Sequence, residues 1–147
     1  MRTVDKQHDL PSPVSVVIPS RPGFEKVAMD AASSYGKLVG LSAERRDDLR
    51  TAVAEACINA MEHGNRFSDE TGVELILRVR KTTLVIDVVD FGSGFRHPVK
   101  RPVLKKKISG EEPARGWGLF LIERLVDEVE FTRTKQKKHV TRLKMHL

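Results

Sequence analysis

The sequence predicts an α/β protein built as a two-layer sandwich, with a mixed, mostly antiparallel sheet and helices on one face. Three observations favour this class. Short β-branched runs of strand type occur near both ends and in the middle of the chain. Other segments carry apolar residues at helical spacing. Lys81-Thr82 makes a short connection between two of the apolar runs, as in an antiparallel hairpin.

The first half of the chain is predicted to hold one strand and two helices. The strand covers residues 15–18 and is followed by two prolines. Apolar residues at helical spacing predict a helix over residues 24–38, with glycines at its far end. A longer helix is predicted over residues 43–63, with Ser42 as its N-cap and Gly64 as its stop.

The second half is predicted to hold four strands, a long loop and one helix. The loop, from about residue 95 to residue 115, has three prolines and many charges, and loops of this length in a compact domain are usually functional or disordered. The remaining elements are a hairpin of strands at 73–79 and 84–89, a helix at 119–127, and closing strands at 128–133 and 139–147. The predicted element order is therefore β-α-α-β-β-loop-α-β-β.

Length and composition indicate one globular domain. Of the 147 residues, 1–13 are predicted to be a flexible N-terminal lead-in and 14–147 a single domain. Cys57 is the one cysteine, which excludes an internal disulfide and fits a reducing cytoplasm. The N-terminus lacks the apolar core of a secretory signal, and no run approaches the roughly 18 apolar residues of a membrane span. We expect a cytoplasmic protein without membrane contact.

The formal net charge of +6 and the pI near 9.7 raise the question of nucleic-acid binding. The excess of basic residues is concentrated at residues 96–107 and 133–138. Neither group is interleaved with aromatic residues for base stacking, and neither lies on an obvious recognition helix. Solvated loops are one reading, and attraction to nucleotide phosphates or to an acidic partner is the other. Direct nucleic-acid binding is not expected.

Glu55, Asn59 and His63 stand at i, i+4 and i+8 of the second predicted helix and therefore share one face. A carboxamide beside a carboxylate offers oxygen ligands for Mg²⁺, which proteins usually hold with one or two groups plus phosphates and water. The carboxylate is then placed to accept a proton from an attacking hydroxyl. The alternative is a polar, solvent-facing stripe with His63 in a structural role. Cys57 is expected in the core.

Asp90-Phe-Gly92-Ser-Gly94 follows a strongly apolar strand. A carboxylate at a strand end is costly to bury unless it receives hydrogen-bond donors, and the exocyclic amine of adenine is such a donor. The glycines allow the backbone to pass close to a flat base. The local alternative is a simple turn capped by aspartate.

Gly116-Trp-Gly118 stands directly before the third predicted helix. Glycines there let the backbone approach a phosphate, which the free amides at the start of a helix favour. Arg115 is close enough in sequence to reach the same phosphate, and Trp117 is expected to pack. The motif is neither a dinucleotide fingerprint nor a Walker loop, because the third glycine and a Gly-Lys-Ser/Thr sequence are both absent.

Together the three motifs resemble those of the Bergerat-fold ATPases, the superfamily of DNA gyrase B, heat-shock chaperones, sensor histidine kinases and mismatch-repair ATPases. The matching boxes are Glu55-x-x-x-Asn59, Asp90-x-Gly92-x-Gly94 and Gly116-x-Gly118-Leu119. The phrase from Glu55 to Gly64 and the run from Gly118 to Glu128 are similar to the stand-alone bacterial anti-sigma-factor serine/threonine-protein kinases of the partner-switching type. The resemblance covers the chain from about Ser15 onward.

The resemblance implies a role for each box in binding ATP and Mg²⁺. Glu55 would be the general base and Asn59 the Mg²⁺ ligand. Asp90 would hold the adenine amine, with Gly92 and Gly94 shaping the base pocket and the hinge of an ATP lid formed by the basic segment. The second glycine box would bind the phosphates through Gly116, Gly118 and Leu119, with Arg115 beside it.

The resemblance also implies the partners. The substrate would be a serine of an anti-sigma-factor antagonist, and the sequestered protein would be an alternative sigma factor. A homodimer is expected. Two other functions stay open: a nucleotide-dependent binding or adaptor module without kinase activity, and a detached histidine-kinase catalytic domain. An intact Glu55 disfavours the first, and the lack of a histidine-bearing dimerisation helix before Glu55 disfavours the second.

Overall fold

The computed structural model describes residues 10–91 and 115–147 of the chain. Five strands and four helical segments are present in this part, in the predicted order. They are β1 (Val14–Pro19), α1 (Glu25–Leu38), α2 (Ala43–Asn59), the π-helical turn η1 (Ala60–Gly64), β2 (Gly72–Arg80), β3 (Thr83–Asp90), α4 (Arg115–Leu125), β4 (Glu128–Arg133) and β5 (His139–His146). The loop predicted at 95–115 lies outside the described residues except for its last residue, and the lead-in predicted at 1–13 does so up to residue 9.

The described sheet has the strand order β1-β2-β3-β5-β4, and every neighbouring pair is antiparallel. The predicted α/β class is confirmed, while the expectation of a mixed sheet is wrong for these strands. The reason lies in the path of the chain. Between β3 and β4 the chain passes through α4, so that β4 runs parallel to β3. β5 then inserts between β3 and β4, which leaves only antiparallel neighbours.

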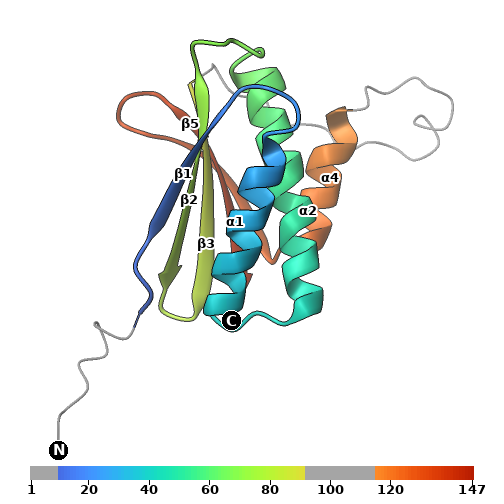
Figure 1. Cartoon of the computed structure of the whole chain (residues 1–147), viewed down its shortest axis with the longest axis vertical. Coiled ribbons are helices and arrows are strands. Elements are labelled where there is room, and N and C mark those ends of the chain that lie inside the picture. The colour runs from blue at the N-terminus through green and yellow to red at the C-terminus, as the bar shows by residue number, and fades with distance from the viewer. Residues whose placement is uncertain (1–9, 92–114) are drawn as a thin grey trace, which may run out of the picture.

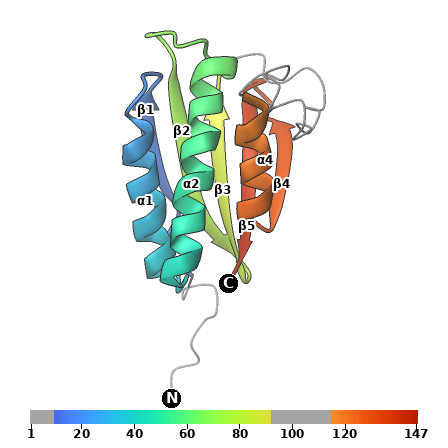
Figure 2. The same ribbon diagram turned by 90° about the vertical axis from the view of Figure 1, so that its right-hand side faces the viewer.

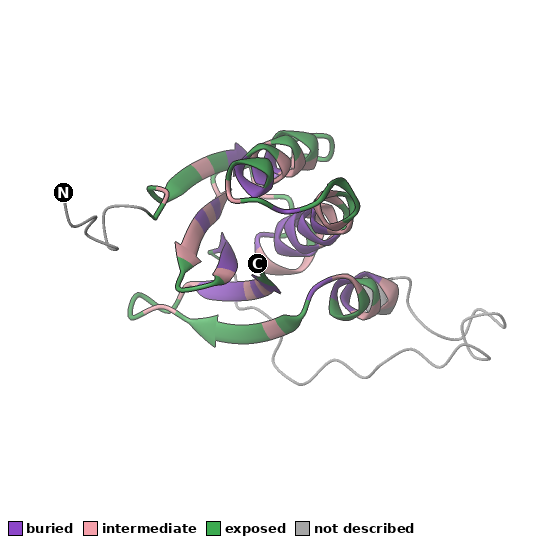
Figure 3. Ribbon diagram, turned by 90° about the horizontal axis from the view of Figure 1, so that it is seen from below, coloured by how far each residue is buried: buried purple, intermediate pink, exposed green. Residues whose placement is uncertain are grey.

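The helices α1, α2 and α4 all cover the same face of the sheet, so the predicted two-layer arrangement is confirmed (Figures 1 and 2). Viewed from below, the buried residues gather where the helices face the strands (Figure 3). The core joins alternate residues of the central strands, such as Leu77, Ile86 and Leu143, to Leu49 and Val53 of α2. The central strands are thereby held against α2, the helix that carries the first motif.

The second predicted helix differs from the observed one near its end. Ser42 is its N-cap as predicted, because the Ser42 hydroxyl accepts a hydrogen bond from the Arg45 amide at 3.2 Å. The α-helical part ends at Asn59, and a π-helical turn follows. Gly64, predicted as the stop, closes that turn without a positive φ.

The left-handed conformation falls instead on the two residues that follow Asn65. Arg66 and Phe67 have φ angles of 51° and 53°. A left-handed cap is therefore not the reason for a glycine at position 64. The reason is steric, because the backbone of Gly64 lies against the side chain of Asp90.

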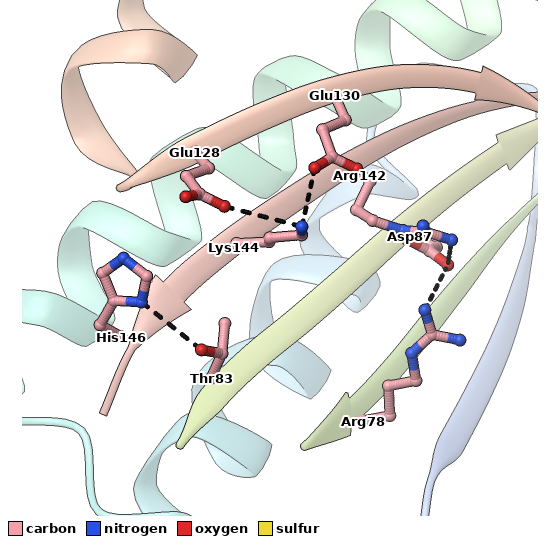
Figure 4. Close-up of polar contacts among 8 residues, drawn as sticks. All are labelled: Arg78, Thr83, Asp87, Glu128, Glu130, Arg142, Lys144 and His146. Carbon is pink, nitrogen blue, oxygen red and sulfur yellow. Dashed lines mark hydrogen bonds and ion pairs between the residues drawn. The ribbon is translucent and has the colours of Figure 1, made fainter. Parts of the chain in front are cut away.

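The face of the sheet away from the helices carries two sets of ion pairs (Figure 4). Asp87 on β3 accepts two hydrogen bonds from Arg142 of β5, at 2.7 and 3.0 Å, and lies 3.6 Å from Arg78 of β2. The hydrogen bond and charge of Asp87 raise the pKa of the Arg142 guanidinium. Lys144 lies 2.7 Å from Glu130 and 3.6 Å from Glu128 of β4. Strands β2, β3, β4 and β5 thus carry paired charges on this face.

Candidate functional site

Two side chains of the first motif lie where α2 meets α4. Asn59, at the last position of α2, is only 7% exposed, and Glu55 one turn earlier is half-buried. Val53 and Cys57, on the other side of the helix, are fully buried in the core, as predicted. Glu55 and Asn59 share a face as predicted, since both lie beside Gly118, whereas His63 lies in the π-helical turn that follows α2. Asn59 is buried and so is not part of a solvent-facing stripe. A buried carboxamide at a helix end needs either partners or a ligand.

The second glycine box packs directly against this pair. A methyl group on Gly118 would stand 2.8 Å from Glu55 Oε2 and 3.3 Å from Asn59 Nδ2, so only glycine lets α4 come this close without displacing them. The predicted helix began at Leu119, whereas α4 begins at Arg115. Gly118 therefore lies inside the first turns of α4 and not before the helix. The fold thus brings together two motifs that are far apart in the sequence.

The Asn59 carboxamide is incompletely hydrogen-bonded within the described part of the chain. Its Nδ2 atom is buried and has no hydrogen-bond partner among the residues that the structure describes. Because buried polar groups are nearly always paired, such an atom marks a place where a ligand or ordered water belongs. The neighbouring oxygens, a carboxamide and a carboxylate, are the hard donors that Mg²⁺ prefers.

A metal centre held by protein side chains alone is absent from the described part of the chain. Within residues 10–91 and 115–147, no group of three or more His, Cys, Asp or Glu side chains is placed to hold a metal ion. A site with one or two protein ligands is instead what Mg²⁺ bound together with phosphates requires. The donor set at Asn59 therefore fits that ion.

Asp90 is the last residue of β3 and points to the helix-covered side of the sheet, with only 3% of its surface exposed. The backbone of Gly64 lies against its carboxylate, and a side chain on Gly64 would overlap the carboxylate atoms. On the neighbouring strand, His139 Nδ1 lies 3.4 Å from Asp90 Oδ2. The close approach to Asp90 is what requires a glycine at position 64.

The environment of Asp90 contains two residues that sequence reasoning missed. His139 pairs with Asp90 across β3 and β5, and its ring stacks on Phe131 with centroids 6.2 Å apart. Asn65 accepts a hydrogen bond from the Phe91 amide, immediately after Asp90. An alternating strand of basic and apolar residues gives no signal for His139, and a lone asparagine after a helix reads as a turn residue.

The other predicted residues fall in three groups. Gly92 and Gly94 lie outside the described residues. Arg115 and Gly116 form the first two positions of α4. Leu119 is buried in the hydrophobic core, and Trp117 makes an edge-to-face contact with Phe120 at 5.4 Å between ring centroids.

Cys57 behaves as a buried structural residue, whereas the structural role of His63 stays a prediction. His63 lies in η1, with Nε2 3.6 Å from Glu62 Oε2. Burial raises the pKa of the Cys57 thiol to about 12, because the thiolate would be desolvated. A thiol with such a pKa is not a nucleophile at neutral pH.

Comparison with known proteins identifies a family and relatives that this chain resembles. Residues 18–145 match the family model of the histidine kinase-like ATPase domain. Proteins named serine-protein kinase RsbW are similar over 80% of this chain. The Bacillus pumilus protein is 30% identical over 123 residues and 76% of its own length, and a Listeria monocytogenes protein is 26% identical over 121 residues and 77% of its length.

A solved structure gives the same fold. The RsbU and RsbW domains of a Mycobacterium tuberculosis protein match with a TM-score of 0.63 and 16% identity. The match covers 93% of this chain and 32% of that one, so it concerns the fold of one part of the larger protein.

None of the helices in the described part of the chain has the length and apolar character that a bilayer crossing requires.

The family match spans nearly the whole chain, and family membership implies use of ATP. The chain belongs to the histidine kinase-like ATPase domain family.

Proposed function

We propose that this protein is an ATP-dependent serine/threonine-protein kinase that phosphorylates a serine of an anti-sigma-factor antagonist and sequesters a sigma factor. The observation that carries the proposal is the contact of Gly118 with both Glu55 and Asn59. It joins a candidate base, a candidate ligand for the cation and the start of a helix in one place. The similarity to proteins named serine-protein kinase RsbW supports the same conclusion.

Glu55 is proposed as the general base. The substrate serine Oγ attacks the γ-phosphorus of ATP and forms the new O–P bond, while the bond from that phosphorus to the β,γ-bridging oxygen breaks. The electron pair of the broken bond stays on ADP, and the serine proton passes to the Glu55 carboxylate. Its half-buried position beside Gly118 supports this role, because a base must be reachable by substrate yet partly shielded from water.

Asn59 is proposed to hold Mg²⁺ through its side-chain oxygen. When bound, the cation neutralises charge on the phosphate oxygens. The buried amide without a partner for Nδ2 among the described residues supports this assignment, since a ligand shell would complete its hydrogen bonding. Gly116 and Gly118 are proposed to let the phosphates approach the first turn of α4, with Arg115 nearby.

Asp90 is proposed to accept a hydrogen bond from the adenine amine, with Gly92 and Gly94 beside the base. The burial of Asp90 and the bare backbone of Gly64 against it support this role. We further propose that the protein works in the cytoplasm as a homodimer, in keeping with a partner-switching kinase.

The proposal is tested by nucleotide binding and phosphotransfer measured on the same preparations. The protein is incubated with labelled Mg-ATP and with a purified antagonist of the family as phosphate acceptor. Glu55→Gln should retain ATP binding within about three-fold and lose phosphotransfer by roughly 100-fold or more, because only the proton acceptor is removed. Glu44→Gln, an exposed carboxylate on the same helix, is the matched control and should keep both.

The possible results separate the two candidate functions. Phosphotransfer that survives Glu55→Gln removes Glu55 as the base. ATP binding without phosphotransfer in the unaltered protein identifies a nucleotide-dependent binding module instead. Absence of ATP binding would overturn both.

A further inference from the structure

Asn65 connects the ends of three strands next to Asp90. Its side chain is 6% exposed. Nδ2 donates hydrogen bonds to the Ser20 hydroxyl at 2.9 Å and to the Gly72 carbonyl at 3.0 Å, just after β1 and at the start of β2. Oδ1 accepts a hydrogen bond from the Phe91 amide at 2.8 Å, just after β3. One buried side chain thus fixes three backbone segments.

The chemistry of these partners permits only asparagine in this orientation. A backbone carbonyl can only accept and a backbone amide can only donate, so the nitrogen must face Gly72 and the oxygen must face Phe91. Aspartate would place an acceptor against the Gly72 carbonyl, and an apolar residue would leave the Phe91 amide without this partner. The orientation of the carboxamide is therefore set by its surroundings.

The π-helical turn places Asn65 where it can reach these groups. The Asn65 amide donates to the Ala60 carbonyl five residues earlier, at 2.8 Å. One extra residue in the turn rotates the subsequent residues by about 100° relative to a continued α-helix. The same turn brings Gly64 against the Asp90 carboxylate. The functional end of α2 and the end of β3 are joined by η1 and the residue after it.

The bond from Asn65 to Phe91 acts on Asp90 through the peptide plane. Because the peptide group is planar, fixing the Phe91 amide also fixes the carbonyl of Asp90 and limits rotation at its Cα. The position of the Asp90 carboxylate is then set from both sides, by Gly64 at its surface and by Asn65 through the backbone.

We propose that Asn65 is a positioning residue for base recognition, holding Asp90 in the place from which it reads the adenine amine. This rests on the proposed function, in which Asp90 binds adenine. A site built to hydrogen-bond one group of its ligand discriminates strongly against ligands that lack it. GTP carries a carbonyl oxygen where ATP carries the amine, so the preference for ATP over GTP reports the placement of Asp90.

The test compares three variants by ATP binding, competition with GTP, and urea unfolding. Asn65→Ala should lower the affinity for ATP by roughly ten- to a hundred-fold and reduce the preference for ATP over GTP by a similar factor. Ser20→Ala is the matched control, because it removes a buried partner of Asn65 but leaves the bond to Phe91. It should lower stability yet keep the ATP preference within about two-fold of wild type. Asp90→Asn should abolish the preference.

The outcomes separate the inference from the proposal on which it rests. If Asp90→Asn loses the ATP preference while folded Asn65→Ala keeps it, Asn65 serves stability alone and the inference is overturned. If Asp90→Asn keeps the preference, the adenine role of Asp90 fails, and the inference fails with it.

A measurement on the unaltered protein covers the case in which Asn65→Ala does not fold. The Phe91 amide should exchange its hydrogen slowly in the absence of nucleotide, because its acceptor is the Asn65 side chain and not a ligand. Exchange as fast as in an exposed loop would contradict the proposed restraint on Asp90. Slow exchange that depends on added ATP would do the same.

Discussion

Two buried aspartates on β3 lie three residues apart and have opposite surroundings. Asp87 is 5% exposed on the open face of the sheet, and Asp90 is 3% exposed on the helix-covered face. Asp87 lies between two guanidinium groups and receives two short hydrogen bonds from Arg142 (Figure 4). The described surroundings of Asp90 include a histidine at 3.4 Å and the bare backbone of Gly64.

The comparison sets a carboxylate held in structural ion pairs beside the carboxylate that we propose to bind adenine. Burying a carboxylate is costly, and Asp87 offsets that cost with geometry that fills both of its oxygens. At Asp90 the backbone of Gly64 lies against the carboxylate without a side chain, and we propose that adenine supplies a further donor there. Two equally buried carboxylates can therefore have different roles, and the groups around each carboxylate indicate which role it has.

The largest effect is expected for Asp90→Asn. The amide keeps one acceptor oxygen but replaces the other with an NH₂ donor and removes the negative charge, so the adenine amine loses its charged acceptor. We expect the affinity for ATP to fall by at least about 100-fold, in line with a buried and unsatisfied hydrogen bond to a charged group. Isothermal titration measures it, and unchanged circular dichroism confirms that the fold persists. An affinity within three-fold of wild type would remove Asp90 from the site.

The complementary change, Asp87→Asn, should act on stability and not on binding. It leaves Arg142 and Arg78 without their carboxylate. Because their side chains are 28% and 37% exposed, we expect a cost of about 2 kcal/mol in the free energy of unfolding, less than for a fully buried pair. The dissociation constant for ATP should stay within about two-fold of wild type. Urea unfolding and titration on one preparation check both numbers. A large loss of ATP affinity without a loss of stability would reverse the assignment of the two faces.

A smaller effect is expected for Gly118→Ala, which changes the part of the site formed by Glu55 and Asn59. The added methyl would stand 2.8 Å from Glu55 Oε2, and that atom is the flexible end of its side chain. Glu55 should therefore move while the helix remains intact, and phosphotransfer should fall by roughly ten-fold at similar stability.

Gly36→Ala provides the control for this change. A methyl at that helical glycine would lie 3.2 Å from Leu41 Cδ1, in the contact between α1 and α2. It should change the unfolding midpoint and leave phosphotransfer unaltered. An equal loss of phosphotransfer in both variants would indicate that the Gly118 effect arises from helix packing and not from Glu55.

Much of the fold could be predicted from local patterns in the sequence. The hairpin of β2 and β3 was predictable because two apolar runs are separated by two residues, of which Lys81 takes a φ of 58°. The N-cap of α2 was predictable from Ser42. The boxes around Glu55 and Asp90 were recognisable because their residue types and order are unusual in combination.

The features that could not be predicted depend on contacts between distant segments. Helical periodicity does not distinguish a continued α-helix from the π-helical turn η1, because the extra residue is decided by what Gly64 and Asn65 meet at the end of β3. The sequence predicts the start of α4 at Leu119, four residues later than the observed start at Arg115. Two glycines disfavour a helix locally, and packing against α2 overrides this preference. The partner of Asp90 on β5 required the strand register.

The smallest effect is expected where charges are paired but exposed. Lys144 hydrogen-bonds Glu130 and lowers the pKa of that carboxyl. A lowered pKa means that any stabilisation is present above the unfolded-state value of roughly 4.3 and disappears as the pH falls through the folded-state value. Because surface pairs contribute little, Glu130→Gln should match the wild-type urea midpoint within error at pH 7, and more closely still below about pH 4.

This last comparison sharpens the distinction between Asp87 and its neighbours on the same face. Glu130→Gln and Asp87→Asn each remove one carboxylate from the two sets of ion pairs in Figure 4, and only the Asp87 carboxylate is buried. If both variants lost the same stability, burial would not separate the contributions of the two sets. A loss confined to Asp87→Asn would show that desolvation decides which ion pairs hold this sheet together.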